Sequence, residues 1–170
     1  MNLINDYYYF SSAISKEFCN KIISCSAGKF YDGLEGRSGD LTVYRKNGVY
    51  FLDDSVSQEV YNLAWPLLHK ANDLGGWSFD IKSTETPQIA EYRKGQFYNW
   101  HRDGKSDSLS VYKKEDVGEN EFLLGNVRKL SLTLNLNDGY EGGQFELAKL
   151  DRDGIRVMGV DNTIGSITIF

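Results

Sequence analysis

The spacing of hydrophobic residues changes along the chain at Trp77, and this change limits the fold more than any other feature of the sequence. Before Trp77, apolar residues recur at the interval of an amphipathic helix. After it, short segments rich in β-branched and aromatic residues are separated by Gly, Asn and Asp. Helices followed by a run of short strands are typical of an α+β fold, in which helices cover one face of a β-sandwich or jelly roll.

Two helices are expected in the first half of the chain. The first lies in residues 11–28, where Ser15 is a good N-cap and Gly28 a good stop signal. The second lies in residues 56–76 and contains Pro66. Because proline removes one backbone donor and clashes with the preceding turn, we expect Pro66 to kink this helix or divide it in two.

Outside these two helices the chain contains two less patterned segments and a run of expected strands. Gly- and charge-rich residues 31–48 favour a surface loop or hairpin. Residues 104–129 are long, charged and weakly patterned, which makes them the candidate lid. The expected strands are WSFDIK (77–82), TPQIAEYRK (86–94), QFYNWHRD (96–103), KLSLTLNLN (129–137), GQFELAKL (143–150), GIRVMGV (154–160) and GSITIF (165–170).

Length, charge and cysteine content narrow the class of protein. The 170 residues suit a single domain, mainly helical over residues 1–75 and β-rich over residues 76–170. The net charge of −5 argues against a broad basic surface for nucleic acid or anionic lipid. Cys19 and Cys25 lack further cysteine partners, which indicates packing roles in a reducing compartment. With no visible signal peptide and no apolar run of about 18 residues, we expect a cytoplasmic protein without a membrane partner.

His101 and Asp103 are the best candidates for a metal site. Side chains two residues apart on a strand point to the same side, so this segment would present an imidazole and a carboxylate to one pocket. These two ligands and a second imidazole form the facial triad of non-haem Fe(II) enzymes. The spacing alone is weak evidence, and the alternative is a histidine in a surface turn.

The residues around this pair strengthen the hypothesis that His101 and Asp103 bind a metal. The segment EYRKGQFYNWHRDG resembles the Y-x-x-G-x-x-Y-x-x-H-x-D motif of the prolyl 4-hydroxylase-like (PKHD-type) branch of the Fe(II)/2-oxoglutarate dioxygenases. Further along, RKLSLTLNLNDGYEGGQFEL resembles the family's next hallmark, a strand followed by a turn with Glu-Gly-Gly. The matching residues are Tyr92, Gly95, Tyr98, His101 and Asp103, and then Glu141, Gly142 and Gly143.

This resemblance implies a double-stranded β-helix (jelly roll) buttressed by the N-terminal helices. It also implies Fe(II), 2-oxoglutarate as co-substrate, ascorbate as a candidate cofactor, and hydroxylation of an unactivated C–H bond. Carried over by motif, His101 and Asp103 are iron ligands, and Tyr92 hydrogen-bonds 2-oxoglutarate. Tyr98 matches a pocket tyrosine of less certain role. For Tyr92 and Tyr98 the alternative is packing within the sheet.

The segment KLSLTLNLN has two chemically different faces. Its leucines fall on one face, which must enter a packed layer, and its Ser, Thr and Asn residues fall on the other. The polar face either meets water or lines a hydrophilic pocket. In a barrel, Asn135 on this face could contact the co-substrate. Gly142 and Gly143 more simply serve the geometry of the following turn.

The family pattern breaks after the Glu-Gly-Gly turn. The family's third iron ligand is a later histidine, followed by an Arg or Lys for 2-oxoglutarate, and no histidine follows His101. The other histidine, His69, lies in the second helix and is expected at its surface. We therefore expect the chain to be a fragment whose last strands are missing, with feeble iron binding and little or no turnover. An exposed sheet edge would then favour self-association.

Two other functions compete with the hydroxylase. One is a metal-free β-sandwich module that binds a sugar or peptide. The other is a nucleic-acid demethylase of the same superfamily, which would want a basic, aromatic-lined groove. For the hydroxylase, the sequence does not distinguish between three kinds of substrate: a protein-bound prolyl or lysyl side chain, a free amino acid and a small metabolite.

Overall fold

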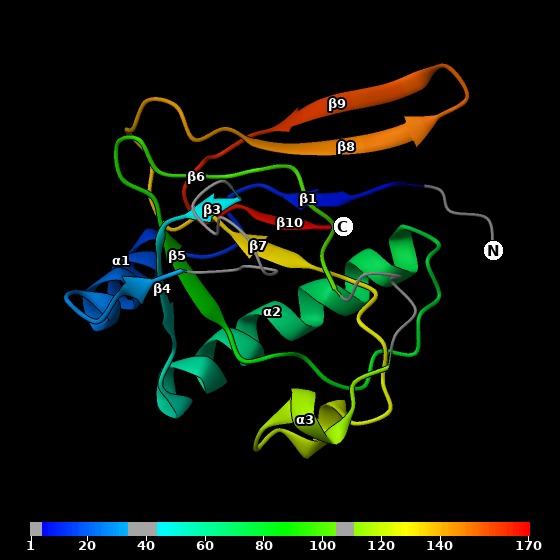
Figure 1. Ribbon diagram of the computed structural model, residues 1–170, viewed down its shortest axis with the longest axis horizontal. Helices are drawn as coiled ribbons and strands as arrows, with labels where there is room; N and C mark the ends of the chain where they lie inside the picture. Colours follow the sequence, from blue (N-terminus) through cyan, green and yellow to red (C-terminus); the bar gives the residue numbers. More distant parts are fainter. Residues whose placement is uncertain (1–4, 34–43, 105–110) are drawn as a thin grey trace.

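The computed structural model describes residues 5–33, 44–104 and 111–170 (Figure 1). The helices in these ranges are α1 (Lys16–Ser26), α2 (Asp54–Leu74), α3 (Lys114–Val117) and a 3-10 turn, η2 (Glu121–Leu123). The first five strands are β1 (Tyr8–Phe10), β2 (Tyr31–Asp32), β3 (Arg45–Lys46), β4 (Gly48–Phe51) and β5 (Gln88–Glu91). The others are β6 (Phe97–Tyr98), β7 (Leu132–Leu134), β8 (Phe145–Asp151), β9 (Gly154–Val160) and β10 (Ile167–Ile169).

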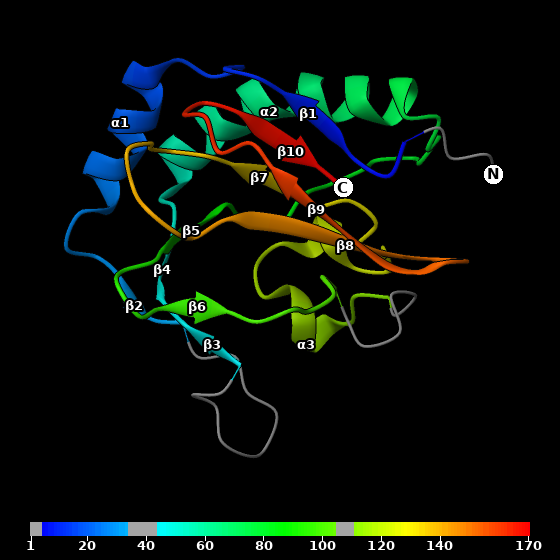
Figure 2. The same cartoon turned by 90° about the horizontal axis from the view of Figure 1, so that it is seen from above.

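The centre of the molecule is a three-stranded antiparallel sheet in the order β1-β10-β7. One row across it joins Tyr9, Thr168 and Thr133, and β10 in the middle is at most 2% exposed. The other sheets have the orders β2-β4-β5, β3-β6 and β8-β9. The central sheet lies beside α2 in both views (Figures 1 and 2).

The leucine face of β7 packs as the alternation predicted. These leucines lie against a core cluster that includes Leu68 and Ala71 of α2 and Ile167 and Ile169 of β10. The packed leucines are Leu130, Leu132, Leu134 and Leu136. The other face of the same strand is therefore turned away from this cluster, which leaves Ser131, on that face, free to meet a different part of the chain.

Helix α1 begins where its cap predicts. The Ser15 hydroxyl accepts a hydrogen bond from the Phe18 amide at 3.2 Å, which satisfies one of the free amides of the first turn. The helix ends at Ser26, and Gly28 follows in the left-handed region with φ of 75°. Ile22 is buried in a second core cluster with Leu52, Val56 and Ile89.

Helix α2 continues through Pro66 as one helix, so, of the two expected outcomes, a kink or a division, the division is wrong. Both Pro66 and Asn62, whose carbonyl loses its usual amide donor, are solvent-exposed. Water can therefore replace the missing hydrogen bond. Val56 on one side of the proline and Leu68 and Ala71 on the other are buried in the two core clusters, so the helix packs against the protein on both sides of Pro66.

The strand predictions after Trp77 hold for most segments and fail for one. Six of the predicted segments overlap β5 to β10, whereas residues 77–82 form no strand. There Asn72 of α2 takes the place of a partner strand, with its side chain bonded to both the amide and the carbonyl of Phe79 at 2.9 and 3.0 Å. Strands β1 to β4 precede Trp77 and are too short to leave an alternating pattern.

The C-terminal hairpin of β8 and β9 extends from the body of the molecule (Figures 1 and 2). Its pairing runs without a bulge from Phe145–Val160 to Asp151–Gly154. At its base, the Phe145 ring contacts Phe170, with ring centroids 5.6 Å apart. Among the described residues, none of the helices combines the length and apolar character needed to cross a membrane.

Gly165 lies where two distant segments meet, and replacing it should be costly. Its φ is 77°, and an added Cβ would lie 2.1 Å from the Ile14 carbonyl oxygen. We expect Gly165→Ala to lower the free energy of unfolding by about 2–4 kcal/mol, since left-handed strain and overpacking add. Urea denaturation would measure this.

Gly139→Ala is the matched control for this substitution. Gly139 has nearly the same φ, 76°, with nothing within 4 Å of an added Cβ. It should cost only the backbone strain, about 1–2 kcal/mol. Equal losses in both variants would show that the contact with Ile14 does not limit the fold.

Candidate metal centre

His101 and Asp103 follow β6 directly, and the strand predicted to carry them ends earlier. The ladder between β6 and β3 stops at the pair Tyr98–Arg45, and residues 101–103 are irregular. The prediction of a strand at these positions is therefore wrong. The two side chains nevertheless converge, with His101 Nε2 3.3 Å from Asp103 Oδ1.

The imidazole of His101 is fixed by two neighbours. Its Nδ1 lies 2.8 Å from the Asn99 carbonyl oxygen, and its ring stacks on Tyr98 with centroids 3.6 Å apart and planes 15° apart. A carbonyl oxygen only accepts hydrogen bonds, so Nδ1 must carry the proton. In the neutral ring, the lone pair then lies on Nε2, which faces Asp103.

This arrangement requires a positive charge between the two side chains. An Nε2 lone pair and a carboxylate oxygen at 3.3 Å repel each other unless a proton or a cation lies between them. Two adjacent ligand atoms about 2.1 Å from an octahedral ion are about 3.0 Å apart, which is close to the observed separation. The donor set therefore fits two neighbouring positions of a transition-metal ion.

The second oxygen of Asp103 is held by residues far along the chain. Asp103 Oδ2 accepts hydrogen bonds from Arg128 Nη2 at 2.9 Å and from the Ser131 hydroxyl at 2.5 Å. Arg128 also contacts Glu85 Oε2 through Nη1 at 3.2 Å. Sequence reasoning missed Arg128 and Glu85. Ser131 was signalled only by its place on the polar face of its segment.

Tyr92 and Tyr98 are linked through a buried arginine. Arg45 is 8% exposed, and its guanidinium donates to Asn47 Oδ1 at 2.8 Å and to Gln88 Oε1 at 3.2 Å. Its guanidinium carbon lies 4.6 Å from the centre of the Tyr98 ring. Partial burial raises the pKa of Tyr92, while nearby Arg45 opposes this rise. The Tyr92 phenol therefore stays protonated at neutral pH and can donate a hydrogen bond.

Asn135 lies on the same strand face as Ser131 but further along. Four residues separate them, which is about 13 Å of extended chain. The Asn135 side chain donates a hydrogen bond to the Asp161 carbonyl at 3.4 Å, in the segment after β9. On this face Ser131 and, on the neighbouring strand, Thr168 are buried, whereas Asn135 is half-buried.

Other residues singled out from the sequence lie apart from this pair. His69 packs edge-on against Trp65 of the same helix, with ring centroids 4.9 Å apart. Cys19 is fully buried, and burial raises the pKa of its thiol, in keeping with a packing role. Gly142 and Gly143 have φ of 78° and 64°, as expected for a turn. Within residues 5–33, 44–104 and 111–170, no third His, Cys, Asp or Glu joins a metal-binding cluster.

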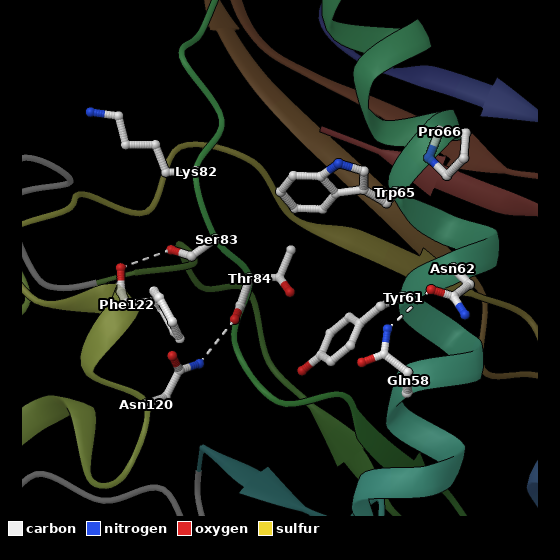
Figure 3. A pocket seen from close by; sticks show the side chains of 10 residues that line it. All are labelled: Gln58, Tyr61, Asn62, Trp65, Pro66, Lys82, Ser83, Thr84, Asn120 and Phe122. Carbon is white, nitrogen blue, oxygen red and sulfur yellow. Dashed lines mark hydrogen bonds between the residues drawn. The ribbon is translucent and has the colours of Figure 1, made fainter.

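A separate groove of about 510 Å³ lies between α2 and residues 82–84 (Figure 3). Its walls combine aromatic rings with amide side chains, and Phe122 at its rim is 83% exposed. The residues lining it are Gln58, Tyr61, Asn62, Trp65, Pro66, Lys82, Ser83, Thr84, Asn120 and Phe122. This set contains no carboxylate, imidazole or thiol, so the groove offers no metal ligands like those of His101 and Asp103.

Comparisons with known proteins identify the fold. No protein-family model matches the chain, and no curated protein matches it. A Pseudomonas putida prolyl-4-hydroxylase superposes with a TM-score of 0.61 at 18% identity, over 96% of this chain and 79% of that one. The viral collagen prolyl hydroxylase of Paramecium Bursaria Chlorella virus-1, in its 2OG complex, gives 0.62 at 18% identity, over 98% and 77%. The chain therefore has the fold of prolyl hydroxylases.

Proposed function

We propose that the protein is an Fe(II)- and 2-oxoglutarate-dependent hydroxylase of the prolyl 4-hydroxylase-like type, built on a double-stranded β-helix. One observation carries this proposal. With Nδ1 bonded to the Asn99 carbonyl, His101 directs its Nε2 lone pair at an Asp103 oxygen 3.3 Å away, and a metal ion between these two atoms would meet the need of this geometry for a proton or a cation. The likeness in fold to two prolyl hydroxylases, one in complex with 2OG, supports the choice of iron and co-substrate.

Each residue has a defined part in this proposal. His101 and Asp103 hold the metal, and Tyr98 and Asn99 orient the imidazole. Tyr92 donates a hydrogen bond to 2-oxoglutarate. When bound, Fe(II) would activate O2 as the oxidant, and 2-oxoglutarate would supply two electrons by its decarboxylation to succinate and CO2, so that one oxygen atom enters succinate and the other the hydroxylated C–H bond. The described residues contribute two ligands, so we expect metal binding by this chain to be weak.

The substrate proposed is one that presents an unactivated C–H bond to this centre. A protein-bound prolyl or lysyl side chain, a free amino acid and a small metabolite all satisfy this chemistry. The names of the two structural neighbours favour testing prolyl peptides first. Asn135, which is half-buried directly after β7, is the further candidate for a co-substrate contact.

Anaerobic titration with Fe(II) tests the metal pair directly. We expect weak binding that strengthens when 2-oxoglutarate is present, because the co-substrate adds oxygen donors to the two protein ligands. His101→Ala and Asp103→Ala should each weaken binding at least tenfold, on the order of the loss of one ligand. The visible charge-transfer band of the ternary complex gives the readout.

His69→Ala is the control, since this histidine packs on Trp65 within α2. It should leave the titration unchanged. A metal-free β-sandwich module would bind no Fe(II) with or without 2-oxoglutarate, and that result would contradict the hydroxylase proposal. Equal effects of the His69 and His101 variants would place the metal elsewhere.

Tyr92→Phe tests the proposed co-substrate contact. Loss of one hydrogen bond should weaken 2-oxoglutarate binding by about three- to tenfold and leave Fe(II) binding without co-substrate unchanged. Because the pKa of Tyr92 is raised, the wild-type contact should persist unaltered from neutral pH up to the ordinary tyrosine pKa of about 10. An unchanged 2-oxoglutarate affinity in the variant would assign Tyr92 a packing role.

A further inference from the structure

Asp103 is the end of a chain of contacts that leads away from the metal pair. Its Oδ2 atom accepts hydrogen bonds from Arg128 and Ser131, while its Oδ1 atom faces His101. A carboxylate rotates easily about its last torsion, since that torsion has broad wells. Two donors on one oxygen restrict this rotation and leave the other oxygen directed at the imidazole.

Arg128 lies between two carboxylates that belong to different segments. Its Nη2 atom donates to Asp103 and to the Ser131 hydroxyl, the latter at 3.0 Å, while Nη1 contacts Glu85. A guanidinium is planar and always charged, so fixing one nitrogen on Glu85 fixes the direction of the other. The Arg128 side chain is 31% exposed, so solvent partly screens its ion pairs with Glu85 and Asp103. These pairs therefore add little stability, and their main effect is to orient the Asp103 carboxylate.

Glu85 also contacts Tyr112, at the other end of the segment that carries Arg128. The Tyr112 hydroxyl donates to Glu85 Oε1, and partial burial with the adjacent Glu85 charge raises the pKa of Tyr112, so this donor keeps its proton. Residues 112 and 125–126 are joined by two backbone hydrogen bonds of 2.9 Å. Tyr112 at the start of the loop 112–126 and Arg128 just after its end therefore both contact the Glu85 carboxylate.

The loop is docked on residues 83–85 by further contacts. The Ser83 hydroxyl donates to the Phe122 carbonyl and the Asn120 side chain to the Thr84 carbonyl, both at 3.2 Å (Figure 3). The Glu85 carbonyl in turn accepts a hydrogen bond from the Tyr61 hydroxyl of α2 at 3.2 Å. Glu85 is thus attached to a long helix, which provides a fixed base for Arg128.

We infer that Arg128 is a positioning residue for Asp103, held by Glu85 and Tyr112, so that docking of residues 111–128 on residues 83–85 sets the direction of the Asp103 carboxylate. The metal-binding side of this inference rests on the proposed function. The contact chain itself, from Tyr112 through Glu85 and Arg128 to Asp103, does not. The two sides are therefore tested separately.

The first test is anaerobic titration of the 170-residue chain with Co(II), whose visible d–d absorption reports ligand geometry. Arg128→Gln removes the charge, and Arg128→Lys keeps the charge but loses the planar fork. If Arg128 positions Asp103, both variants bind Co(II) about tenfold more weakly and change the band shape. If Arg128 acts only as a charge, Arg128→Gln binds the cation more tightly and Arg128→Lys matches the wild type, which would overturn the inference.

Arg156→Gln on the exposed strand β9 is the matched control for charge. It should leave both the affinity and the band unchanged. Affinities of the Arg128 variants equal to that of the control would also overturn the positioning role. Circular dichroism and urea midpoints of all variants identify any that fail to fold. If an Arg128 variant fails to fold, Glu85→Gln serves as the second variant, and it should weaken Co(II) binding as Arg128→Lys does.

The second test needs no metal. Glu85→Gln and Asp103→Asn are combined in the wild-type and in the Arg128→Gln background, and folding equilibria are measured in urea. We expect the pair to be non-additive by about fivefold in the folding equilibrium with Arg128 present and additive without it. Additivity in both backgrounds would overturn the contact chain. Absence of Co(II) binding in the wild type would overturn the proposed function, while this cycle still decides the contact chain.

Discussion

The structure depends on the pairing of β7 with β10, because this ladder divides the molecule into an apolar and a polar side. Leu134 lies opposite Ile167 and Leu132 opposite Ile169, which turns the leucine side of β7 toward α2. The alternate residues then face the other way. A shift of one residue in register would exchange these sides and move Ser131 away from Asp103.

The sequence predicts the parts of this arrangement that are local. The alternation in residues 129–137 predicts a two-sided strand, and Ser15 predicts the start of α1. The His-x-Asp spacing predicts that two side chains converge, and they do, although without the strand that was expected to bring them together. Stacking on Tyr98 and the bond to Asn99 orient the histidine instead, and both partners lie within three residues of it.

The parts that sequence reasoning missed depend on distant contacts. Arg128 and Ser131 lie 25 and 28 residues from Asp103. Arg128 is placed by contact of residues 111–128 with the segment before β5, and Ser131 by its pairing with Phe170 beside β10. Nothing in the local pattern of either segment indicates this. The expected division of α2 at Pro66 fails for a related reason, since packing on both sides of the proline overrides the local preference to end the helix there. The self-association expected from the sequence stays a prediction. In the central sheet the outer strands are β1 and β7, so these two strands, and not β10, would offer an edge for it.

The hairpin of β8 and β9 has a consequence of a different kind. Its base is anchored by Val160 and by the contact between Phe145 and Phe170, whereas Leu150 and Ile155 near its tip are 77% and 74% exposed. Opening of the tip therefore breaks few contacts with the rest of the molecule. The turn at residues 152–153 is accordingly the place where an inserted peptide or label would least disturb the body of the protein.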